Sequence, residues 1–177
     1  FVLVSKCGQA FDDLEGAAWS AQAITQTVDR SLARLGTDHL DVMLLHSCAR
    51  EVLERGEAVA ALLAAREAGK IRFAGYSGDN EAAVYAAGLD GIDVIETSLS
   101  ICDLANLDGV VALARERGLG VIVKRPIANA AWKDLAEQEG TYQNYARVYS
   151  ERFQKMALAP ADLGFAGEAA QAWAEIA

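Results

Sequence analysis

Five short apolar runs recur along the chain, and segments with helical periodicity lie between them. The runs are rich in Val, Ile and Leu and show no polar alternation, which is typical of parallel strands covered on both faces. We expect strands at residues 1–6, 40–47, 70–77, 92–98 and 120–125.

The intervals between these runs predict amphipathic helices. One apolar stripe runs along residues 21–35 and consists of Ile24, Val28, Leu32 and Leu35. Ser20 can cap the start of this helix, and Gly36 follows its end. Further helices are predicted at 59–68, 81–87 and 107–117, the last with Asn106 as a candidate N-cap. Strands and helices therefore alternate, so a parallel α/β fold is the expected class.

The residues at the strand ends favour a barrel over an open sheet. A doubly wound nucleotide fold favours a glycine-rich phosphate loop after its first strand, but SKCGQAFDD at residues 5–13 is neither GxGxxG nor GxxxxGK[ST]. Polar residues gather instead where the strands end: Lys6, His46, Ser77, Glu96, Lys124 and Arg125. A (β/α)8 barrel carries its chemistry at such strand ends. We therefore expect a partial (β/α)8 TIM barrel of about five to six βα units, forming a single domain over residues 1–177.

Composition narrows the class of protein. With 53% hydrophobic and 23% charged residues, the chain is expected to be soluble and globular. A net charge of −9 argues against a nucleic-acid partner or an anionic membrane surface, although a local basic pocket for a phosphorylated cofactor remains compatible with it. No apolar run reaches the length of a membrane span. The three cysteines lack metal-ligand spacing, which predicts reduced thiols in a cytoplasmic protein without a metal site.

Lys6 and His46 are the candidate catalytic residues. Taken singly, Lys6 could extend to the sheet rim or pair with Asp12 or Asp13, and a histidine on an apolar strand is often a hydrogen-bonded core residue. Neighbouring parallel strands lie about 4.8 Å apart, so two such residues at the same end of consecutive strands are expected to face one pocket. The ammonium of such a lysine could lower the pKa of a neighbour, or its uncharged amine could form a Schiff base.

Four segments, taken together, resemble the aldo-keto reductase family. They are FVLVSKCG from residue 1, SLARLGTDHLDVMLLHS from 31, AREAGKIRFAGYSG from 65 and GVIVKRPIANAAW from 120, in family order over residues 1–132. The resemblance implies that Lys6 matches the catalytic lysine, which lowers the pKa of a proton-donating tyrosine. It also implies that His46 matches the histidine that orients the substrate carbonyl and donates to its oxygen.

The same resemblance implies a nicotinamide cofactor site. Ser77 matches the serine that holds the nicotinamide carboxamide, and Glu96 takes the place of an amide-binding glutamine. The seventh strand and its pyrophosphate-binding loop are matched by Lys124, Arg125, Pro126 and Asn129. Two positions depart from the family pattern: Gly78 replaces an asparagine, and Glu96 can accept a hydrogen bond from the carboxamide but cannot donate one.

The implied activity is the reduction of aldehydes or ketones to alcohols by NADPH, with NADH left open, on a small carbonyl substrate. No tyrosine matches the proton donor, which the family carries upstream of the lysine strand. We therefore expect an inactive central piece of a longer reductase, without its first two and last βα units. The alternative is a reductase-like module that binds the cofactor or a partner without turnover.

Two further expectations concern the edges and the C-terminal part. Exposed strand edges predict an oligomer or a swapped dimer. The aromatic-rich residues 140–153 form either an extension near the cofactor or a surface helix that uses tyrosines for packing. Residues 167–177 predict an amphipathic helix.

Overall fold

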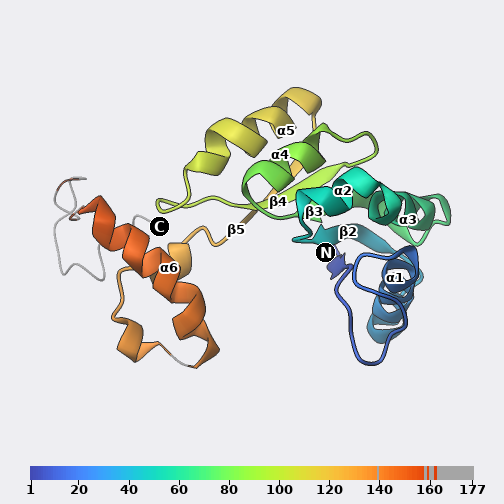
Figure 1. Cartoon of the computed structure of the whole chain (residues 1–177), viewed down its shortest axis with the longest axis horizontal. Helices are drawn as coiled ribbons and strands as arrows, with labels where there is room; N and C mark the ends of the chain where they lie inside the picture. The colour runs from blue at the N-terminus through green and yellow to red at the C-terminus, as the bar shows by residue number, and fades with distance from the viewer. Residues whose placement is uncertain (139, 158, 160–161, 163–177) are drawn as a thin grey trace. The chain divides into compact units, whose positions relative to one another are not determined.

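The computed structural model describes residues 1–138, 140–157, 159 and 162 and divides into two compact units (Figure 1). The first unit comprises Phe1–Thr97 and Ala105–Ile122, and the second comprises Ser98–Leu104 and Val123–Ala177. The predicted helix at 167–177 lies outside the described residues. The expectation of a single domain stays a prediction.

A parallel sheet is the scaffold of the fold. Its five strands lie side by side in chain order: β1 (Val4–Cys7), β2 (Leu40–His46), β3 (Ile71–Ser77), β4 (Val94–Ser98) and β5 (Gly120–Lys124). Parallel pairing joins β1 to β2, β2 to β3 and β3 to β4. Each observed strand falls within a predicted apolar run or extends it by one residue, so the apolar runs located the sheet correctly.

Helices alternate with these strands, which confirms the α/β class. The first unit contains α1 (Ala21–Leu35), α2 (Arg50–Arg55), α3 (Glu57–Glu67), α4 (Asn80–Gly88), the π-helical η1 (Leu107–Val111) and α5 (Ala112–Arg117). The second unit contains the 3-10 turns η2 (Ala128–Ala130) and η3 (Leu135–Glu137), followed by α6 (Thr141–Met156).

The helix ends show where local sequence signals were sufficient. Ser20 Oγ accepts the backbone N–H of Ala23 at 3.2 Å, and Gly36 closes α1 in the left-handed region with φ 65°. The cap predicted at Asn106 is wrong, because this residue has helical backbone angles and makes no side-chain cap bond. Its side chain instead contacts the loop after β3.

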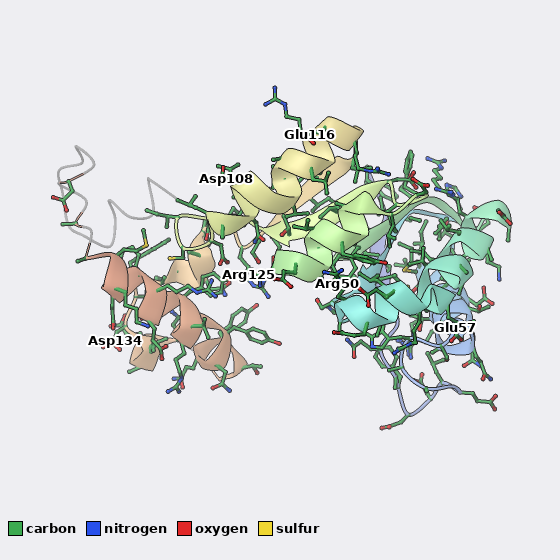
Figure 2. The ribbon with its side chains drawn as sticks, turned by 45° about the horizontal axis from the view of Figure 1, so that its top comes forward. Arg50, Glu57, Asp108, Glu116, Arg125 and Asp134 are labelled. Carbon is green, nitrogen blue, oxygen red and sulfur yellow. The ribbon has the colours of Figure 1, made fainter. Side chains whose placement is uncertain are left out.

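The main core lies between the helices and one face of the sheet. β2 contributes Leu40, Met43 and Leu45, α1 contributes Ile24 and Val28, and α3 contributes Val59 and Leu62. Alanines on α4 let that helix approach closely: Ala83, Ala86 and Ala87 are fully buried. Charged side chains such as Arg50, Glu57 and Glu116 project from the exposed sides of the helices (Figure 2).

The opposite face of the sheet, the inner face, carries a smaller apolar cluster of Val42, Leu44 and Val94. Register places Phe73 beside Val42 on this face, yet Phe73 is 50% exposed. The described residues thus cover the inner face less completely than the apolar runs predicted. No helix in the described ranges has both the length and the apolarity needed to cross a membrane. Association through strand edges stays a prediction.

Candidate active site

Strand register brings the candidate residues of the first unit to one end of the inner face. His46 lies beside Ser77 across β2 and β3, and Ser77 lies beside Glu96 across β3 and β4. Lys6 lies beside Leu44, two residues before His46, and alternate residues of a strand share a face. These four polar residues therefore stand on one face at the carboxyl ends of β1 to β4.

An ion pair joins the first and fourth of these strands. Lys6 Nζ lies 2.9 Å from Glu96 Oε2, and Ser77 Oγ donates to Glu96 Oε1 at 3.4 Å. Glu96 is 8% exposed and Ser77 is 2% exposed, whereas the side chain of Lys6 is 33% exposed. A largely buried carboxylate needs a counter-charge and hydrogen bonds, and Lys6 and Ser77 supply them. We call Lys6, Ser77 and Glu96 the strand-end cluster.

The end of β2 is tied to β3 next to this cluster. Ser47 adopts a left-handed backbone with φ 61°, and both its N–H and its Oγ donate to the carbonyl of Ser77, at 2.7 and 3.1 Å. The carbonyl of His46 accepts the side-chain amide of Gln9 at 3.2 Å. The imidazole of His46 lies at the exposed end of β2. These bonds hold the backbone from which the imidazole extends.

Close packing explains why a glycine, Gly78, follows Ser77. A Cβ at Gly78 would lie 2.4 Å from the ring of Tyr76, which is itself buried. Tyr76 donates its hydroxyl to the carbonyl of Cys48 at 2.7 Å, and burial raises the pKa of its phenol. The ring position at Tyr76 therefore leaves no room for a side chain after Ser77.

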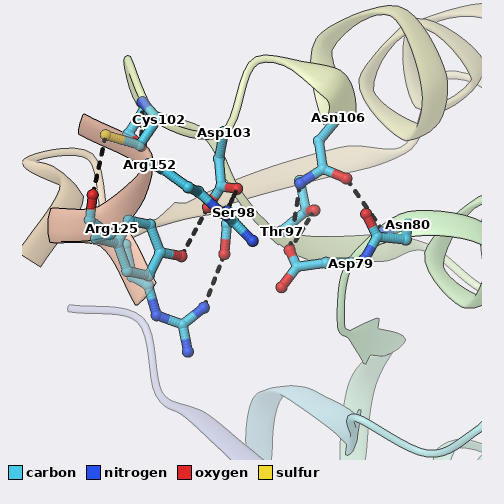
Figure 3. A network of polar contacts seen from close by, with 11 residues as sticks. Asp79, Asn80, Thr97, Ser98, Cys102, Asp103, Asn106, Arg125 and Arg152 are labelled. Atoms are coloured by element: carbon cyan, nitrogen blue, oxygen red, sulfur yellow. Dashed lines mark hydrogen bonds and ion pairs between the residues drawn. The ribbon is translucent and has the colours of Figure 1, made fainter. Parts of the chain in front are cut away.

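A second set of side chains holds the loop after β3 (Figure 3). Asp79 Oδ1 accepts Thr97 Oγ1 at 3.0 Å and Asn106 Nδ2 at 3.4 Å. Asn106 Oδ1 accepts the backbone N–H of Asn80 at 3.2 Å, a residue with φ 58°. The sequence pointed to neither Asp79 nor Thr97, and to Asn106 only as a helix cap, because these bonds join positions 18 to 27 residues apart. They anchor the loop that directly follows Ser77.

The second unit contains its own polar network, which we call the loop cluster: Ser98, Asp103, Arg125, Tyr149 and Arg152. Arg125 donates to Ser98 Oγ at 2.7 Å (Figure 3). The hydroxyl of Tyr149 donates to Asp103 Oδ2 at 2.6 Å. Arg152 forms an ion pair with Asp103. Burial is the largest cause that raises the pKa of Tyr149, and its bond to Asp103 adds to this.

Arg125 also lines a cavity of about 380 Å³ together with Asn129, Thr141, Tyr142 and Tyr145. Asn129 Nδ2 is buried and has no hydrogen-bond partner among the described residues. The backbone around it is left-handed at Arg125, Ala128, Asn129 and Ala130, with φ between 47° and 55°. An unpaired amide donor and a guanidinium at one cavity suit a ligand with anionic or carbonyl oxygens. Pro126 is exposed, and Lys124 ends β5.

Comparison with known proteins decides the family. The model of the "Aldo/keto reductase family" matches residues 1–177. The chain belongs to this family.

Individual relatives agree with this aldo/keto reductase membership. L-galactose dehydrogenase of Arabidopsis thaliana is 28% identical over 137 residues, which cover 72% of this chain and 41% of the plant protein. PA4992 of Pseudomonas aeruginosa superposes with a TM-score of 0.62 at 28% identity, covering 88% of this chain and 57% of that one. The holo form of the aldo-keto reductase AKR11C1 of Bacillus halodurans gives 0.63 at 26% identity, covering 78% and 46%.

The aldo/keto reductase chain thus spans about half the length of these relatives. Its parallel sheet with alternating helices matches part of their TIM barrel, as the strand ends predicted. Ser98, which ends β4 and binds Arg125, was passed over in the sequence. Its position at a strand end, two residues after Glu96, is the signal that could have identified it.

Proposed function

We propose that this protein is an oxidoreductase that reduces aldehydes or ketones to alcohols with NADPH. Within the aldo/keto reductase family, the observation that supports this most directly is the ammonium of Lys6, held 2.9 Å from Glu96 at the carboxyl ends of the strands. Strand ends of this kind carry the chemistry of TIM barrels. The substrate is a small carbonyl compound, and a cytoplasmic location, in keeping with three unpaired cysteines, belongs to the same proposal.

Lys6 and His46 are the proposed catalytic residues. Reduction of a carbonyl needs a hydride at carbon and a proton at the developing alkoxide, and a bound nicotinamide supplies the hydride. A phenol with an ordinary pKa of about 10 is a weak acid at neutral pH, so an adjacent ammonium helps it release its proton. In this proposal Lys6 provides that charge, and His46 orients the carbonyl and donates to its oxygen.

Two groups of residues are proposed to contact the cofactor. Ser77 would contact the carboxamide, and Glu96 is the second candidate for that group. Lys124, Arg125, Pro126 and Asn129 would hold the pyrophosphate. The cavity at Arg125 and the unpaired Asn129 amide support this assignment, because phosphate oxygens accept hydrogen bonds from both groups.

We further propose that the 177 residues alone bind the cofactor without turning over. Two of the five tyrosines already donate their hydroxyls within the fold, Tyr76 to Cys48 and Tyr149 to Asp103. None of the five matches the family's proton donor.

The test compares NADPH oxidation in Lys6→Met and in the matched control Lys133→Met, which changes an exposed lysine. Both are made in the polypeptide of the complete reading frame and assayed with 4-nitrobenzaldehyde. Lys6→Met should lower kcat/KM by about 100-fold or more, while NADPH still quenches the intrinsic fluorescence. Equal activity of the two variants would remove Lys6 from the mechanism. Turnover by the unmodified 177-residue chain would contradict its proposed inactivity.

One observation favours a second candidate, a module that binds nicotinamide cofactor without chemistry. The carboxylate of Glu96 already neutralises Lys6, which reduces the field that the ammonium can exert on a proton donor. Saturable NADPH binding, without oxidation by the polypeptide of the complete reading frame, would select this candidate.

A further inference from the structure

The contact between Lys6 and Glu96 crosses the width of the inner face. Two strands, β2 and β3, lie between β1 and β4 in the sheet. Three strand spacings of about 4.8 Å would separate β1 from β4 by roughly 14 Å if the sheet were flat. The two residues also lie at different levels along the strands. Lys6 pairs with Leu44, whereas Glu96 pairs with Ser77, which lies opposite His46, two residues further along β2. The 2.9 Å separation therefore depends on the curvature of the sheet.

Packing under this contact is tight. Gly75 lies on β3 between Leu44 and Val94, and a Cβ there would come within 2.4 Å of the Val94 carbonyl oxygen and 2.5 Å of Leu44 Cδ2. The floor over which the Lys6 side chain extends is thus formed by closely packed backbone and leucine. Because this floor is rigid, the contact between Lys6 and Glu96 can adjust only through the ends of their side chains.

The charge of Glu96 is informative about its role. A neutral glutamine could accept a hydrogen bond from a carboxamide and also donate one, so amide recognition alone does not call for a carboxylate. A carboxylate that is 8% exposed is costly to bury unless a cation pairs with it. Lys6 is that cation, and Ser77 occupies the other carboxylate oxygen. An acid at position 96 is therefore explained by the lysine.

We propose that Glu96 is the positioning residue of Lys6: it holds the ammonium at the carboxyl ends of the strands, in place of the carboxamide contact that its alignment with the family suggests. The inference rests on the proposed function in one respect, that Lys6 is the residue to be positioned for catalysis. Ser77 keeps its own role toward the cofactor and orients the Glu96 carboxylate from the opposite side.

The test measures how fast the Lys6 amine is acylated. The 177-residue chain is treated with dilute acetic anhydride at neutral pH, and acylation at each lysine is followed by mass spectrometry. Glu96→Gln should raise the rate at Lys6 severalfold, because the amine is no longer held 2.9 Å from a carboxylate and meets the reagent more freely. The rates at the exposed Lys133 and Lys155 serve as internal references for the amount of active reagent.

Matched variants separate positioning from a general effect of removing a charge. Glu54→Gln removes a carboxylate from the exposed ion pair with Arg50 and should leave the Lys6 rate unchanged. Glu96→Asp keeps the charge and should restore at least part of the protection. An unchanged Lys6 rate in Glu96→Gln, or equal rates in Glu96→Gln and Glu96→Asp, would overturn the proposal.

A cofactor titration distinguishes this inference from the proposed function. Under the inference, NADPH should bind Glu96→Gln and the unmodified chain with Kd values within about threefold of each other. If Glu96→Gln raised the Kd for NADPH tenfold or more relative to Glu54→Gln, Glu96 would be a residue that contacts the carboxamide, and the inference would be overturned. If neither protein binds NADPH, the proposed function of the chain fails, while the acylation result still decides whether Glu96 holds Lys6.

Discussion

The strand-end cluster and the loop cluster hold charged side chains by different means. In the first, Lys6, Ser77 and Glu96 extend from strands whose parallel register determines the row of each residue. In the second, Arg125 has φ 55° and Tyr149 lies on a helix, and hydrogen bonds of 2.7 and 2.6 Å link them to Ser98 and Asp103.

This difference predicts which kind of substitution destabilises each cluster. Regular strands transmit a steric change directly to the site, because neighbouring backbones are only about 4.8 Å apart. A residue other than glycine costs about 1–2 kcal/mol in the left-handed region. The side-chain hydrogen bonds of the loop cluster must therefore offset the cost of its left-handed backbone. Four predictions test the contrast.

The largest expected effect is steric and concerns the strand-end cluster. Gly75→Ala should destabilise the protein by about 3 kcal/mol, because the new Cβ would lie 2.4 Å from the Val94 carbonyl oxygen. Urea unfolding followed by circular dichroism measures the loss. Gly88→Ala is the matched control, since no atom lies within 4 Å of its added Cβ, and it should cause no loss. Equal midpoints for Gly75→Ala and the unmodified protein would contradict the packing argument.

The second prediction concerns alkaline pH. Burial, followed by the nearby Cys48, raises the pKa of Cys7 from 9.0 to about 12. The folded protein therefore keeps a proton that the unfolded chain releases above pH 9, so this stability is complete below pH 9 and is lost as pH rises toward 12. At pH 10.5 the loss should be about 2 kcal/mol.

Cys7→Ala isolates this contribution, because it should flatten the fall of the unfolding free energy between pH 8 and pH 10.5. Cys102 in the second unit is less buried, and burial raises the pKa of its thiol as well. Cys102→Ala should flatten the curve less than Cys7→Ala. If Cys102→Ala flattened the curve more than Cys7→Ala, the thiol of Cys102 would be the more strongly shielded from solvent.

The third prediction concerns the loop cluster. Tyr149→Phe should cost about 1–2 kcal/mol, because it removes a hydrogen bond to a carboxylate. Thermal unfolding followed by near-ultraviolet circular dichroism measures the change. Tyr145→Phe removes the same hydroxyl from a side chain that is 60% exposed and should leave stability within experimental error. Similar losses in both would mean that the bond to Asp103 contributes little.

The smallest effect tests the left-handed backbone. Ala130 has φ 54°, so Ala130→Gly should stabilise the protein by about 0.5–1 kcal/mol by relieving strain. The same substitution in the exposed helical residue Ala60 should destabilise it by about 1 kcal/mol. Urea midpoints of the two variants should therefore move in opposite directions, and a shift of both toward lower urea would argue against strain at Ala130.

The sequence by itself determined the elements and their class. Apolar runs without alternation located all five strands, and Ser20 and Gly36 marked the ends of α1 as observed. These features depend on contacts within a few residues, or on the simple requirement that a parallel sheet be apolar. The family resemblance, carried by four segments in order, is confirmed by the match over residues 1–177.

Tertiary structure alone decided which side chains meet. The ion partner of Lys6 is Glu96 on the fourth strand, rather than Asp12 or Asp13, and Arg125 donates to Ser98. Such contacts join positions far apart in sequence, and they depend on sheet curvature and register, which periodicity does not encode. Asn106 illustrates the same limit. Its local context suggested a helix cap, but its side chain forms hydrogen bonds with the segment after β3 instead.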